Sequence, residues 1–235
     1  MRATYTGDLV DGIRQGSGVL VFANGDRYEG AFARGFREGH GVFSSERGNR
    51  VFDGEWKRSE KHGAGKEKWL HSGDRYEGEY QKDVFHGKGC FSKRCSGSKY
   101  EGEFRNGKKH GYGRMEFMRT TSSTSKPNLL KAVQATTMSG ACVYEGTWKD
   151  GRMHGEGKYT RSDGSFYEGT WVDGLSHGFG KEMVMQTGDM YEGHWQKGLR
   201  HGKGAITHNG KHRKGVWESG QRIKWTTAEV PILKK

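Results

Sequence analysis

Residues 144–157 read Y-E-G-T-W-K-D-G-R-M-H-G-E-G, and variants of this stretch recur along the whole chain. Successive copies are separated by 23, 24, 24, 24, 44, 23 and 24 residues, and their first residues are Tyr5, Tyr28, Phe52, Tyr76, Tyr100, Tyr144, Tyr167 and Tyr191. A period of this size indicates a repeat array, in which each unit buries its apolar face against its neighbours.

The composition predicts an ordered fold with a thin core. Glycine supplies 40 of the 235 residues, whereas hydrophobic residues make up only 31%. Few hydrophobic residues and a net charge of +12 are typical of disorder, but disordered chains lack aromatic residues that recur in register. Neither an apolar run long enough to span a membrane nor a secretion signal is predicted from the sequence. The three cysteines lack C-x-x-C spacing, which favours a reducing compartment.

Each repeat has the pattern of a β-hairpin. Strand side chains alternate between faces, so Tyr144, Gly146 and Trp148 share one face. Asp150-Gly151 is a tight-turn signal, and the glycines of the following H-G-x-G segment lie on a second strand. Glycine weakens a strand unless an aromatic ring from the neighbouring strand covers it. The sequence therefore predicts a stripe of structural aromatic residues: Tyr28, Phe32, Trp56, Tyr76, Tyr80, Tyr100, Phe104, Tyr144, Trp148, Tyr167, Trp171, Tyr191 and Trp195.

The consensus Y-E-G-x-W-x-x-G-x-x-H-G-x-G resembles the MORN (membrane occupation and recognition nexus) repeat family. The resemblance implies an all-β fold, an elongated single-layer antiparallel meander of about eight β-hairpins. It divides the chain into repeats one to five (1–117), a flexible insertion (118–140), repeats six to eight with a degenerate ninth (141–222), and a tail (223–235). The tail either caps the last hairpin or binds a partner in extended form.

Positive charge gathers after each aromatic motif. The five residues that follow the eight motifs contain fourteen bases and five acids. In an up-and-down meander these segments fall on one edge, so the sequence predicts a basic edge that either protects the sheet from aggregation or binds an acidic partner. The partner-binding candidates are Arg34, Arg37, Lys57, Arg58, Lys61, Arg105, Lys108, Lys109, Lys149, Arg152, Lys197 and Arg200.

The repeated polar residues have a structural interpretation. Six histidines occupy equivalent positions, but equivalent positions lie roughly 9.5 Å apart, too far to share a metal ion. The acids at the second motif position recur in seven copies, and we expect them to pair with Lys or Arg across strands. An active site would break the repeat symmetry, so we predict no metal, no cofactor and no enzymatic activity.

These observations lead to a functional expectation. Members of the family that this chain resembles include radial-spoke and other axonemal proteins. We therefore expect a scaffold in the cytoplasm and cytoskeleton, with the ciliary or flagellar axoneme as its site. Its partners would be subunits of a large assembly, tubulin or other acidic protein surfaces. The alternative is a peripheral adaptor that binds an anionic membrane. Nucleic acid is a weaker candidate, because the aromatic rings are committed to covering glycine.

Overall fold

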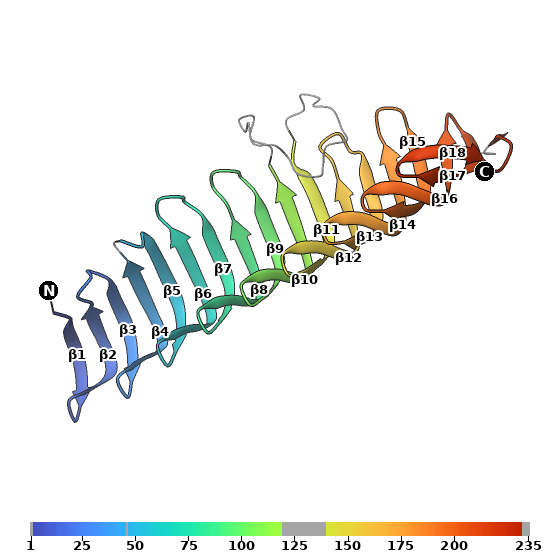
Figure 1. Ribbon diagram of the computed structural model, residues 1–235. Coiled ribbons are helices and arrows are strands. Elements are labelled where there is room, and N and C mark those ends of the chain that lie inside the picture. Colours follow the sequence, from blue (N-terminus) through green and yellow to red (C-terminus); the bar gives the residue numbers. More distant parts are fainter. Residues whose placement is uncertain (1, 46, 119–139, 232–235) are drawn as a thin grey trace. The chain divides into compact units, whose positions relative to one another are not determined.

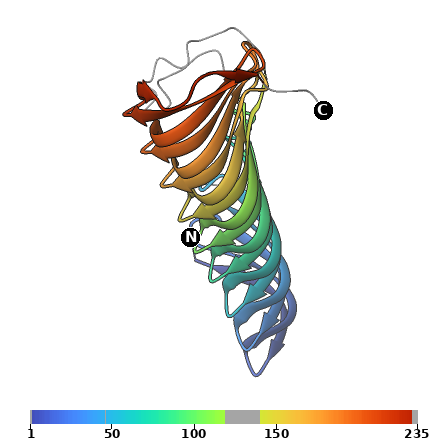
Figure 2. The same ribbon diagram turned by 90° about the vertical axis from the view of Figure 1, so that its right-hand side faces the viewer.

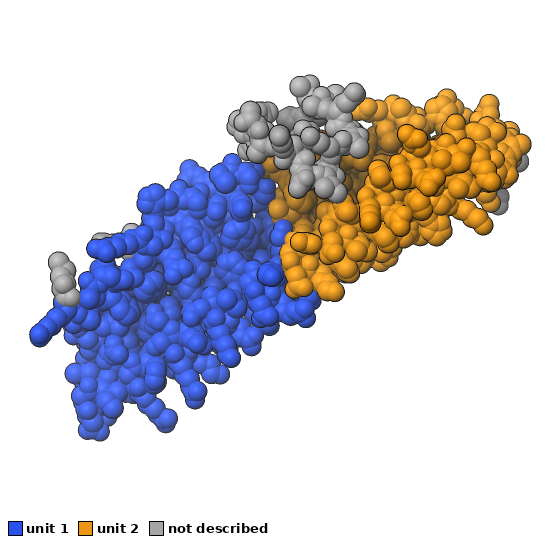
Figure 3. All heavy atoms as spheres, viewed as in Figure 1, with its two compact units in different colours: residues 1–111 blue, residues 112–235 orange. Residues whose placement is uncertain are grey.

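A computed structural model of the chain describes residues 2–45, 47–118 and 140–231. These residues form strands and turns without a helix, so the predicted all-β antiparallel meander is confirmed. Consequently, the described part contains no helix that spans a membrane. The chain divides into two compact units, residues 1–111 and 112–235 (Figure 3). Nearly all of the predicted insertion, including the segment 119–139, lies outside the described residues.

The first unit is a series of hairpins that follow one another in chain order (Figure 1). Neighbouring strands pair antiparallel, and the boundary between the units falls within β10. The strands are β1 (Thr4–Val10), β2 (Ile13–Val21), β3 (Arg27–Ala33), β4 (Phe36–Ser45), β5 (Arg50–Lys57), β6 (Glu60–Trp69), β7 (Arg75–Gln81), β8 (Val84–Ser92), β9 (Lys99–Arg105) and β10 (Lys108–Phe117).

The second unit repeats the same plan, which the turned view also shows (Figure 2). The predicted degenerate ninth unit forms the hairpin β17–β18, and the tail returns to pair with β17 through β19. The strands are β11 (Cys142–Lys149), β12 (Arg152–Thr160), β13 (Phe166–Val172), β14 (Leu175–Val184), β15 (Asp189–Gln196), β16 (Leu199–His208), β17 (Lys211–Glu218), β18 (Gln221–Trp225) and β19 (Val230–Pro231).

The predicted stripe is the core of both units. All thirteen of its residues are buried, with exposed fractions from 0% for Tyr28 to 8% for Trp195. Tyr28 lies flat on Gly41 of the neighbouring strand, where an added Cβ atom would collide with the phenol. The Tyr28 hydroxyl donates to the Ala31 carbonyl at 2.9 Å, and Trp56 Nε1 donates to the Gly41 carbonyl at 2.9 Å. The aromatic cover over glycine is therefore confirmed.

The stripe is continuous from one repeat to the next within each unit. The Tyr28 ring meets Phe32 of its own strand at 5.1 Å and Trp56 of the next repeat at 5.3 Å, both edge to face. Edge-to-face pairs of this kind contribute about 0.5–1.5 kcal/mol beyond their buried area. One layer of rings thus provides the packing that a second layer of structure provides in ordinary domains.

The first turn of each hairpin holds two residues with positive φ, for example 48° at Asp150 and 87° at Gly151. Such turns match the twist of the strands and favour glycine at the second position. Ser59 and Asp83 replace that glycine at φ values of 68° and 67°. Their side chains accept backbone hydrogen bonds from Arg37 (3.1 Å) and Lys61 (2.9 Å) in the preceding repeat. The two departures therefore link successive hairpins.

Candidate functional site

The predicted basic edge separates into two groups. The first group, which we call the turn cations, lies in or beside the first turns of the hairpins and is exposed to solvent. In the first unit, Lys57, Arg58, Arg105 and Lys108 make no ion pair with any described residue. The turn cations are Arg34, Lys57, Arg58, Arg105 and Lys108 in the first unit, and Lys149, Arg152 and Lys197 in the second.

The second group does not lie on the exposed edge, so the predicted position of these residues was wrong. Arg37, Lys61, Lys109 and Arg200 lie over the aromatic stripe, and we call them the stripe cations. Lys61 stands directly opposite Trp56 in the strand pairing, and directly opposite residues share a face. A two-residue turn therefore brings the fifth residue after the motif back onto the aromatic side.

Each stripe cation is close to an aromatic ring. The Arg37 guanidinium carbon lies 4.0 Å from the ring centre of Trp56, and Lys61 Nζ lies 4.6 Å from that of Phe52. The Arg200 guanidinium carbon lies 4.6 Å from the ring centre of Tyr191. A cation at this distance is attracted by the negative face of the ring. These residues cover the stripe, so their aliphatic stems belong to its packing.

Burial changes the ionisation of the stripe cations. It lowers the pKa of Arg37 and of Lys61, and neighbouring acids only partly oppose the effect. Burial, together with the charge of Lys93, lowers the pKa of Lys109 to about 8. Removing a cation from water disfavours its charged form. Three positive groups of the first unit are thus held in a poorly solvated environment.

A buried carboxylate accompanies Lys61. The Glu67 side chain is only 3% exposed, and it accepts hydrogen bonds from Lys61 Nζ at 2.5 Å and from the Tyr80 hydroxyl at 2.9 Å. Arg50 Nη1 lies farther away, 3.7 Å from Glu67 Oε1. Burial and the charge of Glu67 raise the pKa of Tyr80, so the phenol stays protonated and keeps donating. Glu67 is therefore fully paired.

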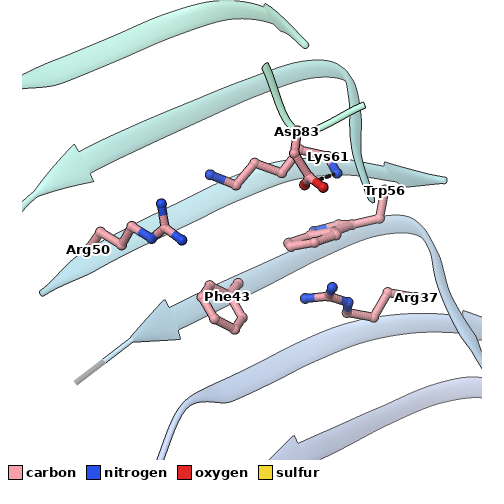
Figure 4. A pocket seen from close by; sticks show the side chains of 6 residues that line it. All are labelled: Arg37, Phe43, Arg50, Trp56, Lys61 and Asp83. Atoms are coloured by element: carbon pink, nitrogen blue, oxygen red, sulfur yellow. Dashed lines mark hydrogen bonds between the residues drawn. The ribbon is translucent and has the colours of Figure 1, made fainter. Parts of the chain in front are cut away.

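Beside this pair lies a cavity of about 320 Å³ on the aromatic side of the first unit (Figure 4). Phe43 and Trp56 form its apolar walls, and Asp83 lies at its rim. The head groups of Arg37 and Arg50 point toward each other from opposite ends. Arg37 Nη2 donates to the Ser59 carbonyl at 2.6 Å, which fixes that guanidinium. The cavity thus holds three basic groups, counting Lys61, around one opening.

Comparison with protein families identifies the repeat. The model of the MORN repeat matches more than half of the chain, at residues 5–27, 28–50, 52–69, 76–94, 100–118, 144–166, 167–183 and 191–207. The chain belongs to the MORN-repeat family. Comparison with curated proteins gives no match.

The seventh MORN repeat of the chain, which lies in the second unit, has a related cluster. Glu182 occupies the same repeat position as Glu67, fifteen residues after the first aromatic residue. Its oxygens pair with Arg161 at 3.3 Å and with the stripe cation Arg200 at 2.9 Å. The Glu182 side chain is 14% exposed, so this cluster is more open to water than the one around Glu67.

The opposite face of the MORN sheet carries the expected ladder of acids. Lys66 pairs with Glu77 across strands at 2.9 Å, and Lys158 pairs with Glu168 at 3.3 Å. Other acids of the ladder pair with different partners, for example Asp53 with His40 at 2.9 Å. Within the described ranges, no three His, Cys, Asp or Glu side chains converge closely enough to hold a metal ion. The ladder has the character of surface ion pairs, which contribute little to stability.

The sequence reasoning missed the residues that make the cavity. Arg50, Glu67 and Asp83 lie outside the predicted site, although each departs from the repeat pattern. The position of Arg50, two residues before the first aromatic residue, holds Asp, Ser, Ala or Cys in every other copy. The position of Glu67, fifteen residues after the first aromatic residue, is apolar in six of the eight copies. These residues are Leu20, Phe43, Phe91, Met115, Tyr159 and Ile206. Their departure from the repeat consensus is the sequence signal that could have identified Arg50, Glu67 and Asp83.

Proposed function

We propose that this MORN-repeat chain is a non-enzymatic scaffold that docks an acidic protein surface through its turn cations. The observation that carries the proposal is the row of exposed bases Lys57, Arg58, Arg105 and Lys108 in the first unit, none of which pairs with a described acid. Exposed bases concentrated on one edge attract an acidic partner and accelerate its association.

A cytoskeletal assembly is the proposed setting, and the ciliary or flagellar axoneme is the specific one. Tubulin tails are acidic and extended, so a linear array of bases on rigid turns matches their chemistry. The chain belongs to the MORN-repeat family, whose members include axonemal scaffolds, and this membership supports the same setting by analogy.

An anionic membrane is the second candidate. Phe36 is 51% exposed and Val84 is 41% exposed, and they lie beside the turn bases Arg34 and Lys82. Apolar side chains flanked by bases suit the interface of an anionic bilayer. Both candidates use the turn cations, so the experiment must offer both partners.

The test uses the double variant Arg105→Glu with Lys108→Glu, because Lys109 belongs to the stripe. Sedimentation is measured with stabilised microtubules, with microtubules stripped of their acidic tails, and with phosphatidylserine vesicles. We expect the wild-type chain to bind intact microtubules, and the variant to bind at least about tenfold more weakly while its melting temperature is unchanged.

The matched control reverses Lys93 and Arg94, two exposed bases in the turn that joins β8 and β9 at the opposite edge. This control should bind like the wild type. Equal sedimentation with stripped microtubules, or equal loss in both variants, would contradict docking through the turn cations. Binding to vesicles but not to microtubules would establish the membrane candidate instead.

A further inference from the structure

The cavity on the aromatic side of the first unit is a break in the repeat symmetry. Arg50 is the only base among the eight residues at its repeat position, and Glu67 is one of only two acids at its own. Together with the stripe cations Arg37 and Lys61, these departures gather several charges around one cavity on the aromatic face. A scaffold that needed only a uniform stripe would not require them.

The charges around the cavity are incompletely matched. Three cations, Arg37, Arg50 and Lys61, face two acids, because Glu67 pairs with Lys61 and Asp83 lies at the rim. The head groups of Arg37 and Arg50 point toward each other in the close view of the cavity (Figure 4). Arg50 is 3.7 Å from Glu67, beyond hydrogen-bond distance. The net charge at the cavity is therefore one positive, carried by two guanidinium groups.

We propose that this cavity accepts the carboxylate of an aspartate or glutamate side chain on a partner segment that lies along the aromatic face. A guanidinium group presents parallel donors that match a carboxylate in two-point geometry. The volume of about 320 Å³ would hold roughly ten waters at liquid density, which is room for an acidic side chain and part of an apolar neighbour.

The chemistry favours a carboxylate over a phosphate. One net positive charge balances a monoanion, whereas a phosphate dianion would be left with excess negative charge beside Glu67 and Asp83. The walls formed by Phe43 and Trp56 add a preference for an apolar residue next to the acid. The inferred ligand is thus an acidic residue flanked by apolar residues in a protein segment.

This site is separate from the turn cations, because Arg105 and Lys108 do not line the cavity. Binding at the cavity and docking through the turn cations can therefore be tested independently. Failure of the microtubule experiment would leave the cavity prediction unchanged, and the reverse also holds.

The experiment follows the indole N–H signal of Trp56 by NMR during titration with the capped peptide Leu-Glu-Leu. The matched probes are capped Leu-Gln-Leu and inorganic phosphate. We expect a saturable shift with the glutamyl peptide, binding roughly tenfold or more tighter than for the glutaminyl peptide, and weaker binding of phosphate.

Three variants of the full chain locate the binding. Arg50→Gln should weaken binding of the glutamyl peptide roughly tenfold, and it should leave the fold intact because the Arg50 side chain is 46% exposed. Arg75→Gln on β7, an exposed arginine outside the cavity, should bind within about twofold of wild type. Arg37→Lys keeps the charge but loses the planar fork, and should also weaken binding.

Three results would overturn the proposal. Equal binding of the glutamyl and glutaminyl peptides, including no binding of either, would show that the carboxylate is not recognised. Unchanged binding in Arg50→Gln would place recognition elsewhere. Tighter binding of phosphate than of the glutamyl peptide would indicate a phosphate-bearing ligand in place of an acidic side chain.

Discussion

Glu67 in the first unit and Glu182 in the second stand at the same repeat position, yet their surroundings differ. Glu67 is 3% exposed and pairs with a buried lysine and a tyrosine. Glu182 is 14% exposed and lies between two arginines, each 27% exposed. Glu67 hydrogen-bonds one cation, Lys61, and forms a longer ion pair with Arg50 at 3.7 Å. Glu182 hydrogen-bonds both of its cations.

The difference shows how one repeat position gives either a structural clamp or a binding site. Around Glu182, both arginines hydrogen-bond the carboxylate, so the cluster connects successive repeats and leaves neither guanidinium without a close carboxylate. Around Glu67, Arg50 lies 3.7 Å from the carboxylate, beyond hydrogen-bond distance. The guanidinium that Glu67 does not hydrogen-bond, and not the carboxylate itself, makes the first cluster the candidate for recognition.

The largest expected effect comes from removing the two carboxylate charges. Glu67→Gln should lower the free energy of unfolding by about 3 kcal/mol, because Lys61 would stay buried without its countercharge. Glu182→Gln should cost about 1 kcal/mol, since water reaches Arg161 and Arg200. Urea unfolding followed by tryptophan fluorescence measures both. Equal losses of unfolding free energy in the two variants would show that burial does not change how much each carboxylate stabilises the fold.

A smaller effect is expected when the whole Glu67 cluster is made apolar. The triple variant Lys61→Met, Glu67→Leu and Tyr80→Phe uses only residues found at equivalent positions of other repeats, namely Met153, Leu20 and Phe104. Well-packed apolar residues often replace a buried ion pair at no net cost, so its free energy of unfolding should lie within about 1 kcal/mol of wild type.

Urea unfolding of this triple variant is compared with that of Glu67→Gln. A triple variant as unstable as Glu67→Gln would mean that the charges contribute directly to the fold. Recovery of stability, combined with weaker binding of the glutamyl peptide, would instead separate the role of the cluster in recognition from its role in folding.

The sequence predicts the hairpins well because their determinants are local. Asp150-Gly151 forms the expected turn, and Tyr28 covers Gly41 as the alternating pattern requires. The predicted location of the basic edge was only partly right, because a window of five residues after each motif includes both turn and strand residues. A two-residue turn places Lys61 opposite Trp56. The expected strand register would therefore have predicted that Lys61 lies on the aromatic face.

The Glu67 cluster was harder to predict from the sequence than the basic edge. Its members Arg50, Glu67 and Tyr80 are separated by 17 and 13 residues and come together only through the pairing of three strands. The repeat pattern shows that Glu67 is unusual, but it does not show which cation pairs with it. That choice depends on side-chain lengths and burial in the folded sheet.

Lys109 is a stripe cation of the fifth repeat. The positions equivalent to Glu67 in the fourth and fifth repeats hold apolar residues, Phe91 and Met115. Burial lowers its pKa to about 8, against an ordinary value of 10.5. Below pH 8, Lys109 is charged in both the folded and the unfolded chain. Between pH 8 and 10.5 the unfolded chain binds more protons, so the free energy of unfolding contributed by Lys109 rises with pH.

The smallest expected effect is therefore a difference in pH dependence between the wild type and Lys109→Met. From pH 7.5 to 9.5, the wild type should gain about 1 kcal/mol relative to this variant, after allowance for partial exposure of the amine. The window stays below pH 10, where tyrosines of the unfolded chain ionise while burial holds the pKa of Tyr28 and Tyr191 at about 12. Urea unfolding at several pH values gives the difference. Lys108→Met, at the adjacent exposed first residue of β10, is the control that should parallel the wild type. Parallel curves for Lys109→Met and wild type would show that the folded surroundings of Lys109 solvate its charged amine as well as water does.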